Sequence, residues 1–145
     1  MTETLYNTEI LRLAASIPHH ERLADPQGSA ERRSPICGSR VTVDVGVGDD
    51  GRVSEVGLLV RACALGQAST ALLAREVIGR TPAELATARD ALTEWLAAGQ
   101  GDAPAWPGLA LFAPALAYSA RHPSIRLAFE AAAEAAEQAR ERAVA

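Results

Sequence analysis

Residues 41–60 read VTVDVGVGDDGRVSEVGLLV, and this stretch decides the fold. Valine occupies every second position from Val41 to Val47, which is the period of two of a half-buried strand. The Gly-Asp-Asp-Gly of residues 48–51 is a tight-turn signal, because Gly and Asp accept the backbone angles that such turns need. Residues 53–60 form the return strand, with Val56, Leu58 and Val60 on one face. The stretch therefore predicts an antiparallel hairpin whose valines face a core.

Helical patterns lie on both sides of this hairpin. Apolar residues near helical spacing predict an amphipathic helix over residues 4–17, ended by Pro18. Residues 65–78 predict a second helix, with Leu65, Ala68, Leu72 and Ile78 facing inward. A third helix begins at the capping box of residues 81–84, Thr-Pro-Ala-Glu, and runs to about residue 98.

The remaining segments complete the expected architecture. Residues 106–118 predict a short helix with a packed turn, and a last helix starts near Pro123 and frays by Arg142. Residues 30–34 are a candidate edge strand beside the hairpin. Together these elements predict an α+β fold, a small three-stranded antiparallel sheet packed against four to five helices on one face.

Length and composition restrict the class of protein. A chain of 145 residues, 48% of them hydrophobic, suits a single domain over residues 1–145 with one core. All 14 basic residues are arginines, and the net charge of −4 argues against nucleic acid as a partner. No apolar run approaches the roughly 20 residues of a membrane span, and the N-terminus lacks the apolar core of a signal peptide. We expect a cytoplasmic protein with reduced thiols and no membrane partner.

The two cysteines flank the hairpin. Cys37 comes just before its first strand and Cys63 just after its second, so both are expected at the open end, opposite the turn. Cys63 also stands at the start of the 65–78 helix, where peptide N–H groups favour a thiolate. Two thiolates at one place suit soft-metal or sulfur chemistry. The alternative, that each cysteine is a small buried hydrophobe, stays open.

Several short motifs, in their order along the chain, resemble the NifU/IscU-type scaffolds of iron–sulfur cluster assembly, in particular the NifU N-terminal domain. The motifs are Tyr6-Asn7, Cys37-Gly38-Ser39, Arg61-Ala62-Cys63, Gln67-Ala68-Ser69-Thr70 and the segment from Gly79 to Leu85. The resemblance implies a carrier that is not an enzyme and that receives sulfur from a cysteine desulfurase. It also implies that Cys37 and Cys63 bind iron or an iron–sulfur cluster, which then passes to iron–sulfur acceptor proteins.

The chain departs from the family pattern at two places. The Asp that follows Cys-Gly in the family is Ser39 here, and the third Cys of the family falls on Pro123 or Ser124, depending on the register. In many members a His precedes that third Cys, and His122 matches it. A His is a competent ligand for zinc or iron. The resemblance therefore implies a metal site of Cys37, Cys63 and His122 with an open fourth position.

Other interpretations remain beside this one. The chain could bind zinc, or no metal, and act as an interaction partner of a cysteine desulfurase, or it could be a redox-active thiol pair that closes a disulfide. His122 could instead cap the last helix, ahead of Pro123. His19 and His20 are expected to be solvated in a loop, and Trp95 and Trp106 to be core residues.

Overall fold

The computed structural model describes residues 6–35 and 38–144. Three strands follow a short first helix, and the other helices come after the sheet. The elements in chain order are α1 (Thr8–Ala14), β1 (Gly28–Arg33), β2 (Arg40–Val47), β3 (Val53–Arg61), α2 (Ala64–Glu76), α3 (Pro82–Ala98), the 3₁₀ turns η1 (Leu109–Ala115) and η2 (Ser119–Arg121), and α4 (His122–Val144). The α+β class predicted from the sequence is confirmed.

The three strands form one antiparallel sheet in the order β1-β2-β3. Val41 and Val43 lie opposite Val60 and Leu58 in the register of β2 and β3, and both valines are fully buried. Gly51, in the turn between the strands, has a φ of 77°, a backbone angle that glycine adopts without steric cost. The expected hairpin and the third, edge strand are both confirmed, with β1 beginning at Gly28.

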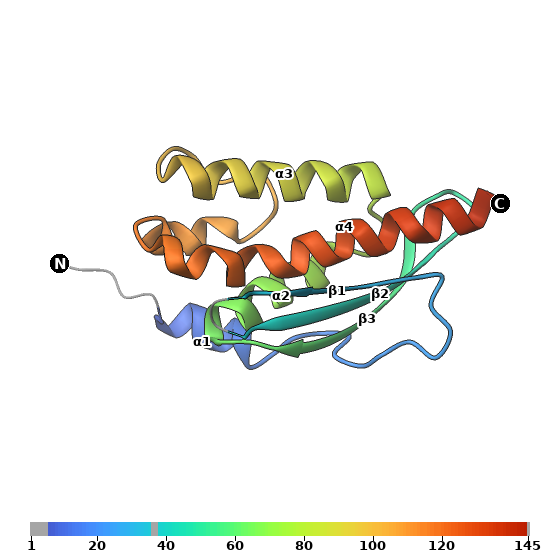
Figure 1. Ribbon diagram of the computed structural model, residues 1–145, viewed down its shortest axis with the longest axis horizontal. Coiled ribbons are helices and arrows are strands. Elements are labelled where there is room, and N and C mark those ends of the chain that lie inside the picture. The colour runs from blue at the N-terminus through green and yellow to red at the C-terminus, as the bar shows by residue number, and fades with distance from the viewer. Residues whose placement is uncertain (1–5, 36–37, 145) are drawn as a thin grey trace.

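Helices α2, α3 and α4 lie on one face of the sheet in two layers (Figure 1). Helix α4 crosses β1 and β2, with α2 beside it, while α3 covers α4 from the side away from the sheet and α1 packs on α2. The inward face of α4 carries Ile125, Leu127 and Phe129 near its start and mostly alanines after them, whose small side chains allow close approach. Gly28 of β1 lies so close to the Ala135 carbonyl of α4 that no Cβ would fit there. Helix α4 therefore forms the centre of the core.

The other face of the sheet is crossed by the segment that precedes β1. The Leu58 N–H donates to the Glu21 carbonyl over 3.2 Å. Asp44, fully buried on this face, accepts hydrogen bonds from Arg22 at 2.6 and 3.1 Å and from the Ser29 hydroxyl at 2.7 Å. The Leu23 N–H donates to the same carboxylate over 3.1 Å. The buried Asp44 carboxylate and the Leu58–Glu21 hydrogen bond therefore hold residues 21–29 on the sheet.

Several predicted helices differ from the observed ones. The last helix, expected to fray by Arg142, stays helical to Val144, and the short helix expected within residues 106–118 is the 3₁₀ turn η1. Helix α1 spans only Thr8–Ala14 of the expected 4–17, and residues 4 and 5 lie outside the described residues. It begins after Asn7, whose side chain accepts from the Ile10 N–H at 3.0 Å, as an N-cap residue does. Helix α2 ends at Glu76, and Ile78 is 46% exposed, so its expected inward position was wrong. The chain turns there, where Gly79 has a φ of 90°, and the turn carries Ile78 outward.

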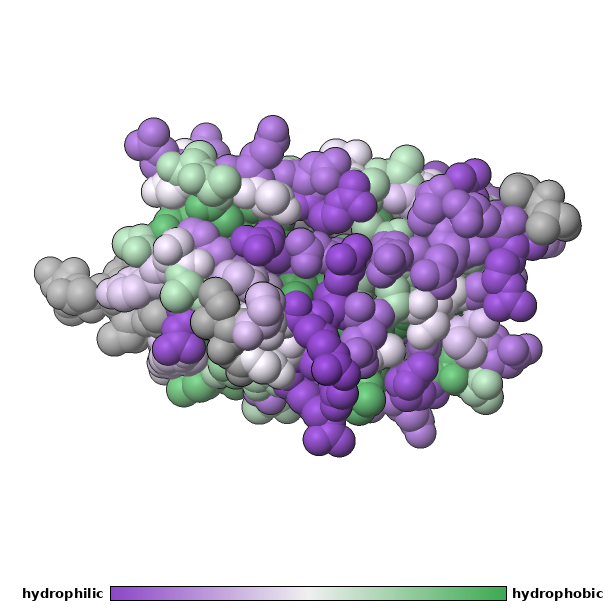
Figure 2. Space-filling model, in the orientation of Figure 1, coloured by the Kyte–Doolittle hydropathy of each residue, from purple (hydrophilic) through white to green (hydrophobic). Residues whose placement is uncertain are grey.

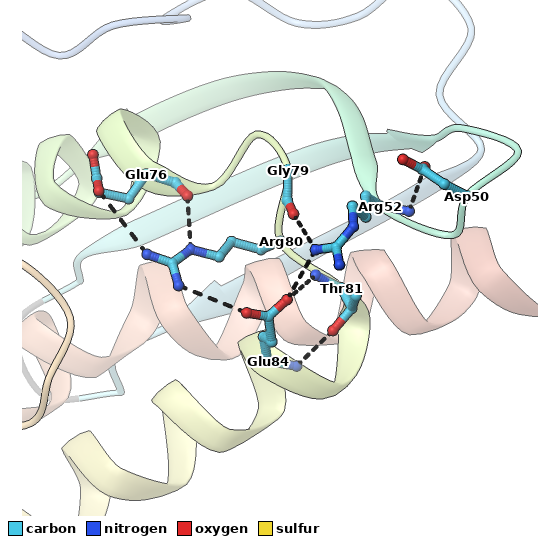
Figure 3. Close-up of polar contacts among 7 residues, drawn as sticks. All are labelled: Asp50, Arg52, Glu76, Gly79, Arg80, Thr81 and Glu84. Atoms are coloured by element: carbon cyan, nitrogen blue, oxygen red, sulfur yellow. Dashed lines mark hydrogen bonds and ion pairs between the residues drawn. The ribbon is translucent and has the colours of Figure 1, made fainter.

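The connection between α2 and α3 is fastened to the hairpin turn (Figure 3). The Val53 N–H donates to the Arg80 carbonyl, and the Gly79 N–H donates to the Val53 carbonyl, each over 2.8 Å. Arg52 donates to the Gly79 carbonyl over 2.9 Å. The predicted capping box at the start of α3 is confirmed, with the Thr81 hydroxyl accepting from the Glu84 N–H at 3.1 Å. These bonds fix the end of the sheet farthest from Cys63.

The face seen in Figure 2 is mostly hydrophilic, with hydrophobic residues in small separate patches. None of the helices in the described ranges is both long enough and apolar enough to cross a membrane.

Candidate functional site

Cys63 lies where β3 passes into α2. It is the N-cap residue of α2, with φ −66° and ψ 171°, and its carbonyl accepts the Gln67 N–H at 2.9 Å. Its side chain is half-buried and makes no capping hydrogen bond. Cys63 is thus at a helix N-terminus, as expected from the sequence, and the sulfur is not engaged as a cap.

The connection between β1 and β2 brings the second cysteine motif to the same end of the sheet. The Ser34 N–H donates to the Ser39 carbonyl over 2.8 Å, and the Gly38 N–H donates to the Ser34 carbonyl over 3.2 Å. Gly38 has a φ of 73°, which closes this tight connection. Cys37, the residue directly before Gly38, lies outside the described residues.

A surface pocket of about 390 Å³ joins the two motifs. It is bounded by the turn after Cys37, the end of β3, the start of α2 and the turn before α4; its lining residues are Gly38, Ser39, Arg61, Ala62, Cys63 and Arg121. The Cys37-Gly38-Ser39 and Arg61-Ala62-Cys63 motifs therefore meet at one pocket through the residues next to Cys37. Arg61 and Arg121 are both exposed and bring positive charge to it.

Ser39 and Ser124 meet beneath this pocket. Their hydroxyl oxygens are 3.5 Å apart, and both side chains are buried, Ser124 in the first turn of α4. Gly66 lets the start of α2 lie close to the start of α4, because a Cβ there would lie 3.3 Å from the Ser124 carbonyl oxygen and 2.7 Å from the Ala62 Cβ. The Ser69 hydroxyl donates to the Ile125 carbonyl over 2.6 Å and ties α2 to α4. Sequence reasoning singled out both serines but did not pair them, because they lie 85 positions apart in the chain.

His122 is placed differently. It is 6% exposed at the start of α4, and its Nε2 lies 3.0 Å from the Ala115 carbonyl oxygen at the end of η1. Because a carbonyl only accepts, Nε2 carries the hydrogen of this bond. His122 is not among the residues that line the Cys63 pocket, so the structure brings together the two cysteine motifs and Ser124 but leaves the His122 ring facing η1.

The other singled-out residues lie elsewhere. His19 and His20 are exposed, and neither lines the Cys63 pocket. Trp95 and Trp106 are core residues, as expected, with their indole N–H groups donating to the Gly101 and Leu72 carbonyls. In the described part of the chain, no three His, Cys, Asp or Glu side chains are grouped so that they could hold a metal ion.

The arrangement restricts the chemistry of the pocket. A cysteine sulfur at a helix N-terminus, beside two guanidinium groups, suits an anionic sulfur species or a soft metal bound by thiolates. Serine hydroxyls are weaker ligands for such metals. The described residues provide one thiol, and further strong ligands must come from Cys37, from His122 after rotation, or from outside the chain.

Comparison with solved structures finds close matches of this fold. The crystal structure of a nitrogen-fixing NifU-like protein (N-terminal) from Brucella abortus is 41% identical, with a TM-score of 0.88, over 94% of this chain and 95% of that one. A protein of Fervidobacterium islandicum AW-1, assigned to the SUF system as an iron–sulfur cluster assembly scaffold, is 21% identical with a TM-score of 0.80. That second comparison covers 91% of this chain and 96% of the other and shows a shared fold.

Comparisons of sequence alone find no match, unlike the comparison with solved structures. No family model matches the chain, and a search of curated proteins finds no similar sequence. The identity to the Brucella protein extends over nearly the full length of both chains, well above the level at which only the fold is shared. This chain therefore belongs to the family of NifU-like proteins and corresponds to their N-terminal part.

Proposed function

We propose that this chain is an iron–sulfur cluster assembly scaffold or sulfur acceptor, in which Cys37 and Cys63 bind iron or a cluster as cargo. The family membership supports this role, since one structural neighbour is assigned as a scaffold of this kind. The observation that carries the proposal is the pocket at which Cys63 meets Gly38 and Ser39, the two residues that follow Cys37. Such a carrier has no turnover of its own.

Sulfur would arrive as the persulfide of a cysteine desulfurase. A thiolate of this chain attacks the outer sulfur, the S–S bond of the persulfide breaks, and the thiolate of the desulfurase leaves. This transfer needs no external oxidant or reductant. Release of the sulfur as sulfide takes two electrons, which a dithiol can supply. The assembled cargo would pass to iron–sulfur acceptor proteins in the reducing cytoplasm.

Ser124 is our candidate for the position of the missing third cysteine. Of the two residues that the register allows, Pro123 and Ser124, it is Ser124 whose side chain contacts Ser39, and Ser39 occupies the position of the family's Asp. A pair of hydroxyls there would leave cargo held weakly beside Cys63. His122 stays a proposed third ligand, which would require its ring to leave the Ala115 carbonyl.

Anaerobic reconstitution of the full chain with ferrous iron and sulfide tests the proposal. The wild type is expected to develop charge-transfer absorption in the visible range, with bound iron and sulfide by chemical analysis, and Cys37→Ala and Cys63→Ala are expected to lose both. Cys63→Ser provides a sharper variant, because Ser is a preferred N-cap residue and should preserve the start of α2. A cluster that survives in all three variants would contradict the proposal.

The same samples separate the remaining interpretations. One zinc ion per chain and no cluster would favour a zinc-binding partner of a desulfurase. A reversible disulfide without bound metal would favour a redox-active thiol pair. Iron affinity in His122→Ala decides the third ligand: a loss at least as large as in Ser124→Ala supports His122, and unchanged affinity removes it from the site.

A further inference from the structure

Three arginines form a row across the end of the sheet that carries the cysteine motifs. Arg33 of β1 lies opposite Arg40 of β2, and Arg40 in turn lies opposite Arg61 of β3. Like charges directly opposite each other on neighbouring strands destabilise a sheet. The packing of the fold does not explain this row, and a bound anion would remove its cost.

Few carboxylates balance the row. Glu31 accepts a hydrogen bond from Arg33 over 2.9 Å and lies 3.8 Å from Arg40. Among the described residues Arg61 has no ion pair, and the side chain of Arg33 is 65% exposed. The chain as a whole has a net charge of −4, so this concentration of positive charge is local.

The row borders a hollow of its own. A pocket of about 410 Å³ is lined by the three arginines together with Ser34, Pro35 and Gly38, and none of these described lining residues is acidic. Gly38 and Arg61 also line the Cys63 pocket, so the two hollows adjoin. Arg121 adds a fourth guanidinium group at the Cys63 pocket. A molecule held by the row would thus lie beside the proposed cargo site.

We propose that Arg33, Arg40 and Arg61 form a docking surface for an acidic segment of the partner protein that exchanges sulfur or cluster with Cys63. This inference rests on the proposed function. Planar guanidinium groups pair with carboxylates in a fork geometry. Neighbouring strands lie about 4.8 Å apart, so the row is about 10 Å across, which matches two or three carboxylates of an extended peptide. Nucleic acid is disfavoured, because the rest of the chain is acidic.

The test uses a fluorescently labelled hexaglutamate peptide and measures its binding to the full chain by anisotropy. The triple variant Arg33→Gln/Arg40→Gln/Arg61→Gln is expected to weaken binding about tenfold or more, and added salt should weaken binding to the wild type. The matched control, Arg12→Gln/Arg89→Gln/Arg140→Gln, removes the same charge from α1, α3 and α4 and should change binding much less. A hexaglutamine peptide should not bind.

Three results would overturn the docking surface. They are equal binding to the wild type and the row variant, equal weakening by the two triple variants, and tighter binding of a labelled six-nucleotide oligomer than of hexaglutamate. Relief of like-charge repulsion predicts a melting temperature for the row variant no lower than that of the wild type. Arg61→Gln alone removes no ion pair of the described residues and repeats the test if the triple variant does not fold.

The experiment is independent of the proposed function. Cluster reconstitution on the chain alone needs no peptide, and peptide binding needs no iron. If the chain binds hexaglutamate through the row but never holds a cluster, the scaffold function is refuted and the docking surface for an acidic segment stands. If the chain holds a cluster but does not bind the peptide, only the docking surface is refuted.

Discussion

The hydroxyl of Ser124 occupies the place where we put the third thiolate of the family. Because a thiolate binds iron more strongly than a hydroxyl does, Ser124→Cys should hold a cluster longer against a chelator, about threefold or more in half-life. The measurement is the decay of visible absorption after the chelator is added. Ser119→Cys, which adds an exposed thiol in η2, is the matched control. Equal half-lives in the two variants would remove Ser124 from the site.

Asp44 is the residue for which pH dependence follows from the structure. Burial alone would raise the pKa of Asp44, but the hydrogen bonds from Arg22, Ser29 and the Leu23 N–H outweigh burial, so the pKa lies below its ordinary value. A pKa lowered by folding stabilises the native state above the unfolded-state pKa, and this stabilisation is lost as pH falls through the folded-state pKa.

Asp44→Asn should therefore lower the free energy of unfolding at pH 7 by about 2 kcal/mol, since Arg22 and Ser29 lose an ionised acceptor. The difference from wild type should narrow as pH falls below about 4. Urea unfolding at several pH values measures both effects. Asp49→Asn in the exposed hairpin turn is the control. A gap that stays constant down to pH 2 would contradict the linkage.

Single residues also mark the limit of sequence reasoning. In Val-Thr-Val-Asp-Val, the alternation assigns the Asp44 side chain to the solvent face. Asp44 does lie on the face of the sheet that is opposite to the face of the valines. It is nevertheless buried, because the segment before β1 covers that face. Gly57 fits this cover, because a Cβ at that position would lie 2.5 Å from the Glu21 carbonyl oxygen. Local periodicity carries no information about which distant segment covers a face.

At the scale of elements, helix boundaries were predictable where side chains encode them. Helix α3 begins at the capping box that the sequence spells out, and Gly99 ends it with a φ of 71°. Helix α1 ends at Ala14, although its amphipathic pattern continues to residue 17. The pattern predicted too long a helix, because apolar spacing alone does not mark where a helix stops. The buried alanines of α4 are read correctly as helix, but their close contact with β1 depends on tertiary packing.

The capping box gives a prediction for α3. Thr81→Ala removes the hydroxyl that accepts the Glu84 N–H and should lower the free energy of unfolding by about 1 kcal/mol. The loss corresponds to a fall of about 2–4 °C in melting temperature. Thr87→Ala, an exposed position within the same helix, should leave the melting temperature nearly unchanged. Equal effects of the two substitutions would show that the cap is not a determinant of stability.

At the scale of the whole molecule, the order of the motifs predicted the family, and the comparison with the Brucella protein confirms it. The hairpin and the helix after it were enough to predict where Cys63 lies. The arginine row was not predictable, because residues 33, 40 and 61 come from three different strands and are aligned only by the register between those strands. The contact of Ser39 with Ser124 depends in the same way on how α4 begins over the sheet.

Iron K-edge X-ray absorption of the reconstituted full chain tests the central claim most directly, because it identifies the atoms bound to iron. Our account predicts sulfur neighbours and an iron–iron distance typical of a cluster, and loss of both in Cys63→Ser, whose melting temperature stays at the wild-type value. Iron surrounded only by oxygen and nitrogen in the wild type, or an unchanged spectrum in Cys63→Ser, would contradict it.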